Sequence, residues 1–435
     1  MFFLGYLIVN LIDLKFTIYE KLATGFLIST GLSTFLWFIF TSFGFTFDLK
    51  MCLNILTVLI IVFLILNIIF KNINSLKFPI FNFRVSKFQL IVTLLILIAV
   101  VSSLIANLYW PIRDWDALTL YDFRGKFFAS ENSISDVFKI HRYYLGYPLY
   151  TSLLHAFVYL LDVKGNPLFI YTLIYASFIV AFYFNLKRIT SNKIALLFTF
   201  VIAFTFEIFD HSLLSYTNLP YSAFLLLGYL YFINYVKDTK LSSLVLASLL
   251  IGLSGWIRSS DPFWIPALLL MIYESIKNKK FNHLVMFIVI VLTIRLPWNY
   301  FVSEISKGYS VTSSNNLNLI FTTSISKYID RLFLVIPYVW INVIKPQLSV
   351  YLMFVLTLLM YIPKPSKVLT ITRFLVLINL CVIIGGVYFY SIVYEKWQVI
   401  GNSVTRMSIF MTPLILIVVA ITVSHKYSNL FSNEK

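Results

Sequence analysis

The chain has 435 residues, of which 60% are hydrophobic and 12% are charged, about half the charged share of an ordinary soluble domain. This composition excludes a soluble globular protein and indicates an integral membrane protein. The net charge of +16 does not point to nucleic acid, because the 34 Lys and Arg residues are spread over short loops and form no single basic face.

Apolar stretches recur along the whole chain, each long enough to cross about 30 Å of hydrocarbon as a helix. No alternating ten-residue pattern suggests a barrel, so the predicted fold is all-α, with one membrane domain over residues 1–435. The first twelve residues lack a basic start and a cleavage site, and are expected to form an interfacial or partial span. About twelve spans are expected, near 22–44, 49–70, 88–109, 167–186, 194–208, 220–236, 241–257, 262–276, 281–297, 347–363, 368–394 and 407–424.

Two further segments, 148–161 and 331–345, are short for a crossing at about 1.5 Å per residue. We expect them to be interfacial or re-entrant helices. With both left out, four cationic clusters fall on the same side as both termini, as the positive-inside rule requires. The clusters are Lys71/Lys77/Arg84/Lys87, Lys187/Arg188/Lys193, Lys277/Lys279/Lys280 and Lys364/Lys367.

That cationic side is predicted to be the cytoplasm of a cell with this protein in its inner or plasma membrane. Most of the 18 Asp and Glu residues then fall on the outer side. Two long outer loops stand out: 110–147, dense in charge and aromatics, and 298–330, rich in Ser, Asn and Thr. Any chemistry is therefore expected at the extracytoplasmic face.

The first outer loop opens with the sequence YWPIRDWDALTLYDFRGKFF at 109–128, directly after an uncharged span. Trp110 and Trp115 could be aromatic anchors at the interface, and Arg113 could pair with lipid phosphates. Asp114 and Asp116 are not explained in this way, because a carboxylate gains nothing from an anionic headgroup layer. A functional role is therefore the better interpretation of the two aspartates.

Asp114-Trp115-Asp116 is also a D-x-D triplet, a pattern with which many glycosyltransferases hold a metal and a sugar nucleotide. No Gly-rich phosphate loop or βα unit accompanies it, and nucleotide sugars are cytoplasmic whereas this loop is predicted to face outward. A donor that reaches this face must come through the lipid. No cofactor is assigned with certainty, and a divalent metal is left open.

Several segments resemble the GT-C glycosyltransferases, in particular bacterial relatives of protein mannosyltransferases and of aminoarabinose transferases. WDALTLYDFRGKFF, followed by YPLYTSLLHAF at 147–157, is similar to the family's first outer loop. SYTNLPYSAFLLL at 215–227, LTIRLPWNYF at 292–301 and NSVTRMSIFMTPLIL at 402–416 resemble later motifs in family order. The resemblance covers roughly residues 110 to 416, and it implies a GT-C-like multi-span bundle with a large first outer loop.

The resemblance implies an inverting transfer of a sugar from a polyprenyl-phosphate donor to an acceptor. Asp116 aligns with the family's loop aspartate and is the expected general base, with Asp114 in reserve. Arg124 and Lys126 align with its basic pair and are expected to bind the donor phosphate.

Arg258 and Arg406, at span ends on the same outer side, are further candidates for the donor phosphate, although each could instead be an anchor at the interface. His141, Tyr147 and Asn218 are candidate substrate contacts. His141 fits an exposed loop residue better, and Asn218 stands where the family usually has Asp. No metal ligands are assigned.

Asp261, three residues after Arg258, could pair with it or could cap the helix expected to begin at Pro262; the cap is the better interpretation. The expected partners are membrane lipid, the lipid-linked donor and an acceptor that could be protein, lipid or glycan.

Two other kinds of protein fit the span count. A transporter or flippase would show buried mid-span charges or broken helices repeated in two halves, and neither is evident. A lipid-linked polysaccharide polymerase would be expected to place its key arginines in late outer loops, not an acidic pair in the first.

Overall fold

The computed structural model describes all residues except 14, 71–85, 307–323, 363 and 427–435. Lys71, Lys77 and Arg84 of the first cationic cluster, and the middle of the 298–330 loop, lie outside the described residues. The described chain divides into two compact units, Met1–Asp261 with Lys280–Trp298, and Pro262–Lys279 with Asn299–Lys435. The expectation of a single membrane domain stays a prediction.

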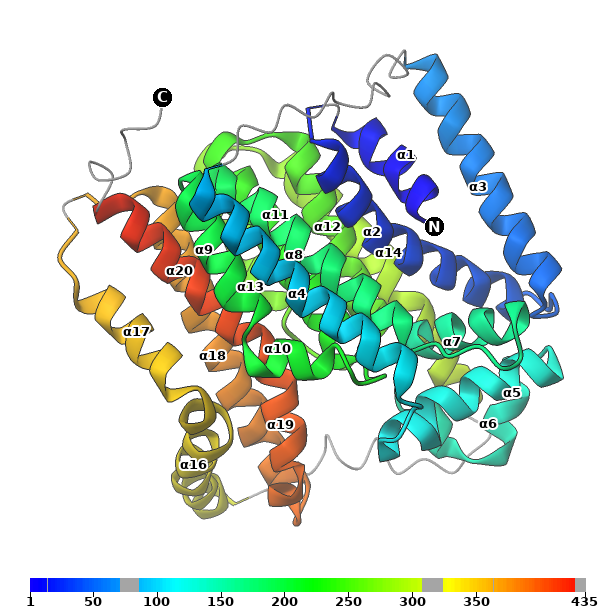
Figure 1. The fold of residues 1–435 in the computed structure, drawn as a ribbon. Helices are drawn as coiled ribbons and strands as arrows, with labels where there is room; N and C mark the ends of the chain where they lie inside the picture. The colour runs from blue at the N-terminus through cyan, green and yellow to red at the C-terminus, as the bar shows by residue number, and fades with distance from the viewer. Residues whose placement is uncertain (14, 71–85, 307–323, 363, 427–435) are drawn as a thin grey trace. The chain divides into compact units, whose positions relative to one another are not determined.

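The first unit is built from helices and contains no strand among its described residues. Its elements, shown in Figure 1, are α1 (Phe2–Ile12), α2 (Ile18–Ser42), α3 (Leu49–Ile69), α4 (Lys87–Tyr109), the π-helix η2 (Ala117–Asp122), α5 (Phe123–Glu131), α6 (Asp136–Ile140), the 3₁₀-helix η3 (Arg142–Leu145), α7 (Tyr150–Leu161), α8 (Phe169–Ile189), α9 (Asn192–Ala203), α10 (Phe206–His211), α11 (Asn218–Asp238), α12 (Leu241–Ile257) and most of α14 (Phe281–Ser306).

The second unit is also helical throughout its described part. It contains α13 (Ile265–Asn278), the end of α14, α16 (Ile325–Val339), the π-helix η4 (Trp340–Ile344), the 3₁₀-helix η5 (Lys345–Gln347), α17 (Leu348–Leu359), α18 (Lys367–Val393), the 3₁₀-helix η6 (Trp397–Ile400), α19 (Gly401–Met407), the 3₁₀-helix η7 (Ser408–Phe410) and α20 (Met411–Lys426). The all-α prediction is confirmed for the described residues of both units.

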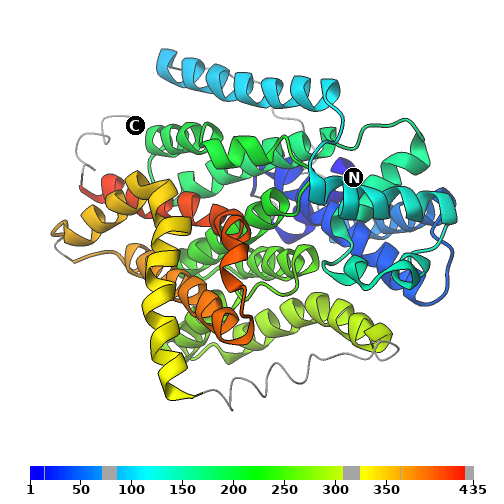
Figure 2. The ribbon, with the colours of Figure 1, turned by 90° about the horizontal axis from the view of Figure 1, so that it is seen from below.

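The centre of the first unit is α11, which is buried along its whole length. It packs against α8 and α12, and its Tyr231 hydroxyl is hydrogen-bonded to side chains of α2. By contrast, α3 and α4 expose most of their surface, and both are strongly apolar, with mean hydropathy 2.9 and 2.7. Figures 1 and 2 show the two helices from two sides. A helix that is apolar all round and still exposed suits a lipid environment, so these two helices are expected to face the acyl chains.

The short helix α1 is fixed to α2 by a close crossing of two glycines. A Cβ atom added to Gly5 would lie 2.0 Å from the carbonyl oxygen of Gly25, and one added to Gly25 would lie 2.3 Å from the carbonyl carbon of Gly5. No side chain fits at this crossing, so the two backbones touch directly. Small residues that let helix backbones approach in this way are typical of membrane helix packing.

The described residues contain nine helical segments long and apolar enough to cross a membrane, which makes the chain a multi-pass membrane protein. The predicted count of twelve spans is not confirmed. The segments at 194–208, 241–257 and 262–276 are shorter helices of 12, 17 and 14 residues. The doubtful segment 331–345 joins the predicted span 347–363 in one helical run, Ile325–Leu359, through η4 and η5.

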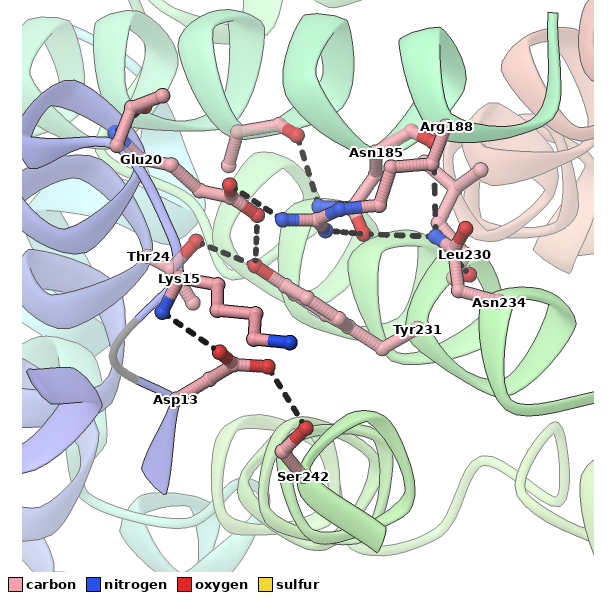
Figure 3. A network of polar contacts seen from close by, with 12 residues as sticks. Asp13, Lys15, Glu20, Thr24, Asn185, Arg188, Leu230, Tyr231, Asn234 and Ser242 are labelled. Carbon is pink, nitrogen blue, oxygen red and sulfur yellow. Dashed lines mark hydrogen bonds and ion pairs between the residues drawn. The ribbon is translucent and has the colours of Figure 1, made fainter. Parts of the chain in front are cut away.

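A buried polar network joins α2, α8 and α11 near the ends that are predicted to face the cytoplasm (Figure 3). The Nη2 of Arg188 lies 2.5 Å from a carboxylate oxygen of Glu20, and the Tyr231 hydroxyl donates to the other oxygen at 3.0 Å. Glu20 is only 1% exposed, whereas the Arg188 side chain is 28% exposed. The ion pair therefore holds three helices together and keeps a buried carboxylate satisfied.

Candidate functional site

The segment 114–116, which we call the acidic turn, follows α4 and leads into the π-helix η2. Asp116 is half-buried and occupies the N-cap position of η2. The turn is set by backbone and hydroxyl contacts: the Leu118 N–H donates to the Asp114 carbonyl at 2.8 Å, and the Thr119 hydroxyl donates to the Trp115 carbonyl at 2.8 Å. Single-turn π-helices are rare and frequently occur at functional sites. The π-helix η2 thus connects Asp116 to the rest of the first outer loop.

Four segments of the first unit meet at η2 in a group that we call the tyrosine–arginine cluster. Its members are Tyr121, Tyr147, Thr217, Arg258 and Asp261. The hydroxyls of Tyr121 and Thr217 are hydrogen-bonded at 3.2 Å, and Arg258 Nη1 donates to the Thr217 hydroxyl at 3.4 Å. The Arg258 guanidinium carbon lies 5.1 Å from the Tyr147 ring centre, and the Tyr121 and Tyr147 rings are 5.9 Å apart. Two predicted site residues, Tyr147 and Arg258, are thus brought together.

The interpretation of Asp261 as a helix cap was wrong. The helix begins at Ile265 with Trp264 as its N-cap, and Asp261 instead pairs with Arg258, whose Nε lies 2.7 Å from Oδ2. Burial lowers the pKa of Arg258, but the Asp261 charge more than offsets this, so the pKa is raised and the guanidinium stays charged. Arg258 is therefore a cation held in a fixed position at the C-terminal end of α12.

A second guanidinium, which the sequence analysis did not single out, reaches the same turn from α14. Arg295 Nη2 donates to the carbonyls of Ser259 at 2.7 Å and Asp261 at 3.3 Å. Gly255 makes room for it, because a Cβ there would lie 2.2 Å from Arg295 Nη1. Two buried arginines thus lie at one turn: Arg258 pairs with the Asp261 carboxylate, and Arg295 donates to backbone carbonyls. The turn therefore carries two guanidinium groups and one carboxylate. Arg295 lies inside the quoted segment LTIRLPWNYF, but nothing in its apolar surroundings marks it in the sequence.

Arg124 is buried among backbone carbonyls. Its Nε donates to the Ser152 hydroxyl and its Nη1 to the carbonyls of Tyr144 and Tyr147, all at 2.9 Å, and its Nη2 reaches the Pro148 carbonyl at 3.4 Å. Burial lowers its pKa to about 10. These contacts favour a role in holding segment 144–148, and with it Tyr147, against α5. The predicted phosphate contact is not tested by them and stays a prediction.

Replacing Arg124 by Lys should lower the free energy of unfolding by about 2 kcal/mol or more, because one ammonium cannot reach four separated acceptors and buried carbonyls would lose their donors. Thermal unfolding of the purified full chain measures this. Arg142→Lys, on the exposed turn of η3, is the matched control and should change little. Unchanged stability with weakened donor binding in Arg124→Lys would instead assign Arg124 to the phosphate.

Lys126 pairs with Asp122 one helical turn before it, with Nζ 2.9 Å from Oδ2, and its own side chain is 62% exposed. Asp122 is buried and also accepts from the Tyr159 hydroxyl and from Nδ1–H of His155, 3.3 Å away. Burial raises the pKa of Asp122, but the hydrogen bonds from His155, Tyr159 and Lys126 outweigh it and lower the pKa to about 2. The network joins α5 to α7, and Lys126 is the member of the network whose side chain is exposed.

The other predicted site residues are spread out. His141 is exposed and accepts the Tyr143 N–H at 3.1 Å, so it caps η3. Asn218 is buried at the start of α11. Arg406 lies in α19 of the second unit, so its predicted position on the same outer side as Arg258 stays a prediction. Within the described residues, no group of three or more His, Cys, Asp or Glu side chains is arranged to hold a metal ion.

No protein-family model matches the chain, and no curated protein matches it. Among solved structures, the chain is similar to the crystal structure of ArnT from Cupriavidus metallidurans bound to undecaprenyl phosphate, with 14% sequence identity and a TM-score of 0.48. The match covers 76% of this chain and 60% of the ArnT chain, so it spans about three fifths of that protein's length. At this identity and TM-score, the likeness assigns neither an activity nor a substrate.

Proposed function

We propose that the protein transfers a sugar from a polyprenyl-phosphate carrier to an acceptor at the extracytoplasmic membrane face, with inversion at the anomeric carbon. The observation that carries the proposal is a pair of buried arginines at one turn, where Arg258 pairs with the Asp261 carboxylate and Arg295 donates to the backbone carbonyls of the same turn. The positive charge of Arg258 lies close to Tyr121 through their shared contact with Thr217, and Tyr121 belongs to η2, which begins at Asp116. The resemblance to the GT-C glycosyltransferases likewise implies a loop aspartate, Asp116, that acts with basic residues, there Arg124 and Lys126.

The leaving group in such a transfer is a lipid phosphate, which gains negative charge as the bond from the anomeric carbon to the phosphate oxygen breaks. Fixed guanidinium groups stabilise that charge without reorganising, and the planar fork of Arg suits two phosphate oxygens. The ion pair with Asp261 fixes Arg258 through Nε. Arg258 is therefore the first choice for the phosphate contact, with Arg295 behind it.

The acceptor hydroxyl attacks the anomeric carbon on the face opposite the leaving phosphate, which gives inversion. Its proton passes to Asp116, which is assigned as the general base because a half-buried carboxylate at the start of η2 remains reachable from outside. The products are the glycosylated acceptor and the free polyprenyl phosphate. Asp114, two residues earlier, is the reserve for this role.

Replacing Arg258 by Gln should weaken the binding of undecaprenyl phosphate about tenfold or more, because a charge-assisted contact to the phosphate is lost. Titration of the purified full chain in lipid nanodiscs, followed by native mass spectrometry, measures the affinity. The double variant Arg258→Gln/Asp261→Asn removes the stranded carboxylate, so it keeps the fold while binding stays weak.

Arg142→Gln, which removes an exposed arginine from η3, serves as the control and should bind undecaprenyl phosphate normally. Wild-type affinity in the folded double variant would show that Arg258 does not hold the phosphate, and the donor assignment of the tyrosine–arginine cluster would then be abandoned.

A further inference from the structure

A cavity of about 80 Å³ lies at the C-terminal end of α4, where this helix meets the start of α8 and the loop before α11. At roughly 10–15 Å³ for each water position, it has room for on the order of five to eight water molecules, about the space of one sugar ring. It is lined by Ala106, Asn107, Trp110, Pro111, Ile112, Arg113, Asp114, Leu168, Leu213 and Ser215. Mostly apolar walls with a few convergent polar groups are typical of small-ligand sites.

The strongest sign of a ligand is the Ser215 hydroxyl. Ser215 is 1% exposed, and its Oγ has no hydrogen-bond partner among the described residues, although it belongs to the cavity wall. A buried hydroxyl without a partner costs about 1–3 kcal/mol, so such groups are rarely left unsatisfied. Because Ser215 lines the cavity, its hydroxyl could turn toward a polar group bound there and gain the partner that the described residues do not supply.

The charges around the cavity indicate which polar group fits. The guanidinium of Arg113 lies 5.7 Å from the Trp110 ring centre, and both residues are exposed. Because both also line the cavity, a ligand can reach it from the surface of the protein. Asp114 lines the same wall, and the pKa of nearby Asp210 is raised by burial and then by the Asp114 charge, with Arg113 acting against them. Two carboxylates near one guanidinium disfavour an anion. Neutral hydroxyls can both accept from Arg113 and donate to Asp114.

We propose that this cavity binds one neutral sugar ring, and that this ring belongs to the acceptor of the transfer. The second half of this inference rests on the proposed function. Asp114 and Asp116 are two residues apart at the start of η2, and Ser215 and Thr217 are two residues apart before α11. Two residues span at most about 7 Å, so the cavity adjoins both the proposed base and the tyrosine–arginine cluster. The attacking hydroxyl is thereby assigned to a sugar and not to a protein side chain.

Saturation-transfer NMR on the full chain in nanodiscs, without sugar-headed lipids or detergents, tests the binding. The probes are the methyl glycosides of glucose, galactose, mannose and N-acetylglucosamine. At least one should give a saturable signal that inorganic phosphate does not displace. Ser215→Ala should weaken it about three- to tenfold without lowering thermal stability, because the Ser215 hydroxyl has no hydrogen bond to lose among the described residues. Ser215→Leu, which fills the cavity, should abolish it.

Ser33→Ala is the matched control, since Ser33 on α2 is equally buried and its hydroxyl also has no partner among the described residues. It should leave the signal unchanged. No signal from any probe, displacement by phosphate, or full binding by Ser215→Ala would overturn the sugar site.

Adding the proposed donor to the same experiment distinguishes a failure of this sugar site from a failure of the proposed function. Undecaprenyl-phosphate glucose should leave the methyl glycoside bound if the cavity holds the acceptor, and displacement would instead place the donor's own ring there. A signal that depends on Ser215 while Asp116→Asn transfers normally would keep the sugar site and remove the catalytic assignment.

Discussion

Replacing Asp116 by Asn should reduce turnover about a hundredfold or more, the usual contribution of a positioned general base. The amide keeps the size of the side chain and can still form hydrogen bonds, but it cannot take the proton of the attacking hydroxyl. The fold should survive, because Asp116 is half-buried at the start of η2 and no core site is emptied. The measurement is release of undecaprenyl phosphate from an undecaprenyl-phosphate sugar by the purified protein.

Asp114→Asn guards against a general effect of removing charge from the acidic turn. It should reduce turnover less than Asp116→Asn, because the resemblance places Asp116, not Asp114, in the catalytic position. Transfer at nearly the wild-type rate by a normally folded Asp116→Asn protein would leave Asp116 as an ordinary interfacial aspartate.

Replacing Arg188 by Met should lower the free energy of unfolding by about 3 to 5 kcal/mol, because it strands the Glu20 carboxylate between α2, α8 and α11. Breaking a buried ion pair on one side costs more than removing both partners. Adding Glu20→Gln to Arg188→Met should therefore recover much of the loss, since the Tyr231 hydroxyl can donate to the amide oxygen as it does to the carboxylate. Thermal unfolding in one detergent measures all three proteins.

Lys187→Met is the control, because it removes a positive charge from the preceding position of α8, where the side chain is exposed and lies over the Tyr183 ring. Its stability should stay close to that of the wild type. Equal losses in Lys187→Met and Arg188→Met would mean that the net charge of the helix end, and not the buried pair, sets the stability.

The sequence predicted the most apolar helices best. The expected spans 49–70 and 88–109 differ by a residue from α3 and α4, because a continuous apolar run leaves little choice of boundary. The boundaries fail where tertiary contacts decide them. The predicted span 194–208 is broken between α9 and α10 at Phe204 and Thr205, and neither residue is a helix breaker in sequence. Likewise, η4 carries the helix from α16 toward α17, which an apolar pattern cannot reveal.

For the candidate site, the sequence indicated single residues but not their partners. Tyr147 was selected through the resemblance and Arg258 from its position at a span end on the predicted outer side, and the structure places them together. Thr217 and Arg295 were not found, because a threonine in a loop and an arginine in an apolar run have no local signal of a shared site. Arg124 shows the reverse case. A loop arginine is ordinarily exposed, and its burial under four acceptors depends on segment 144–148 folding back onto α5.

The enclosure of α11 has a consequence for how the protein is made. Its mean hydropathy of 1.3 is the lowest among the nine candidate spans, and it carries Asn234 and several tyrosines, so lipid alone is a poor environment for it. Its neighbours α2 and α8 precede it in the chain, and α12 follows after a tight turn at Thr239, where φ is +56°. During synthesis, α11 therefore enters a membrane that already contains α2 and α8, and α12 is inserted directly after it.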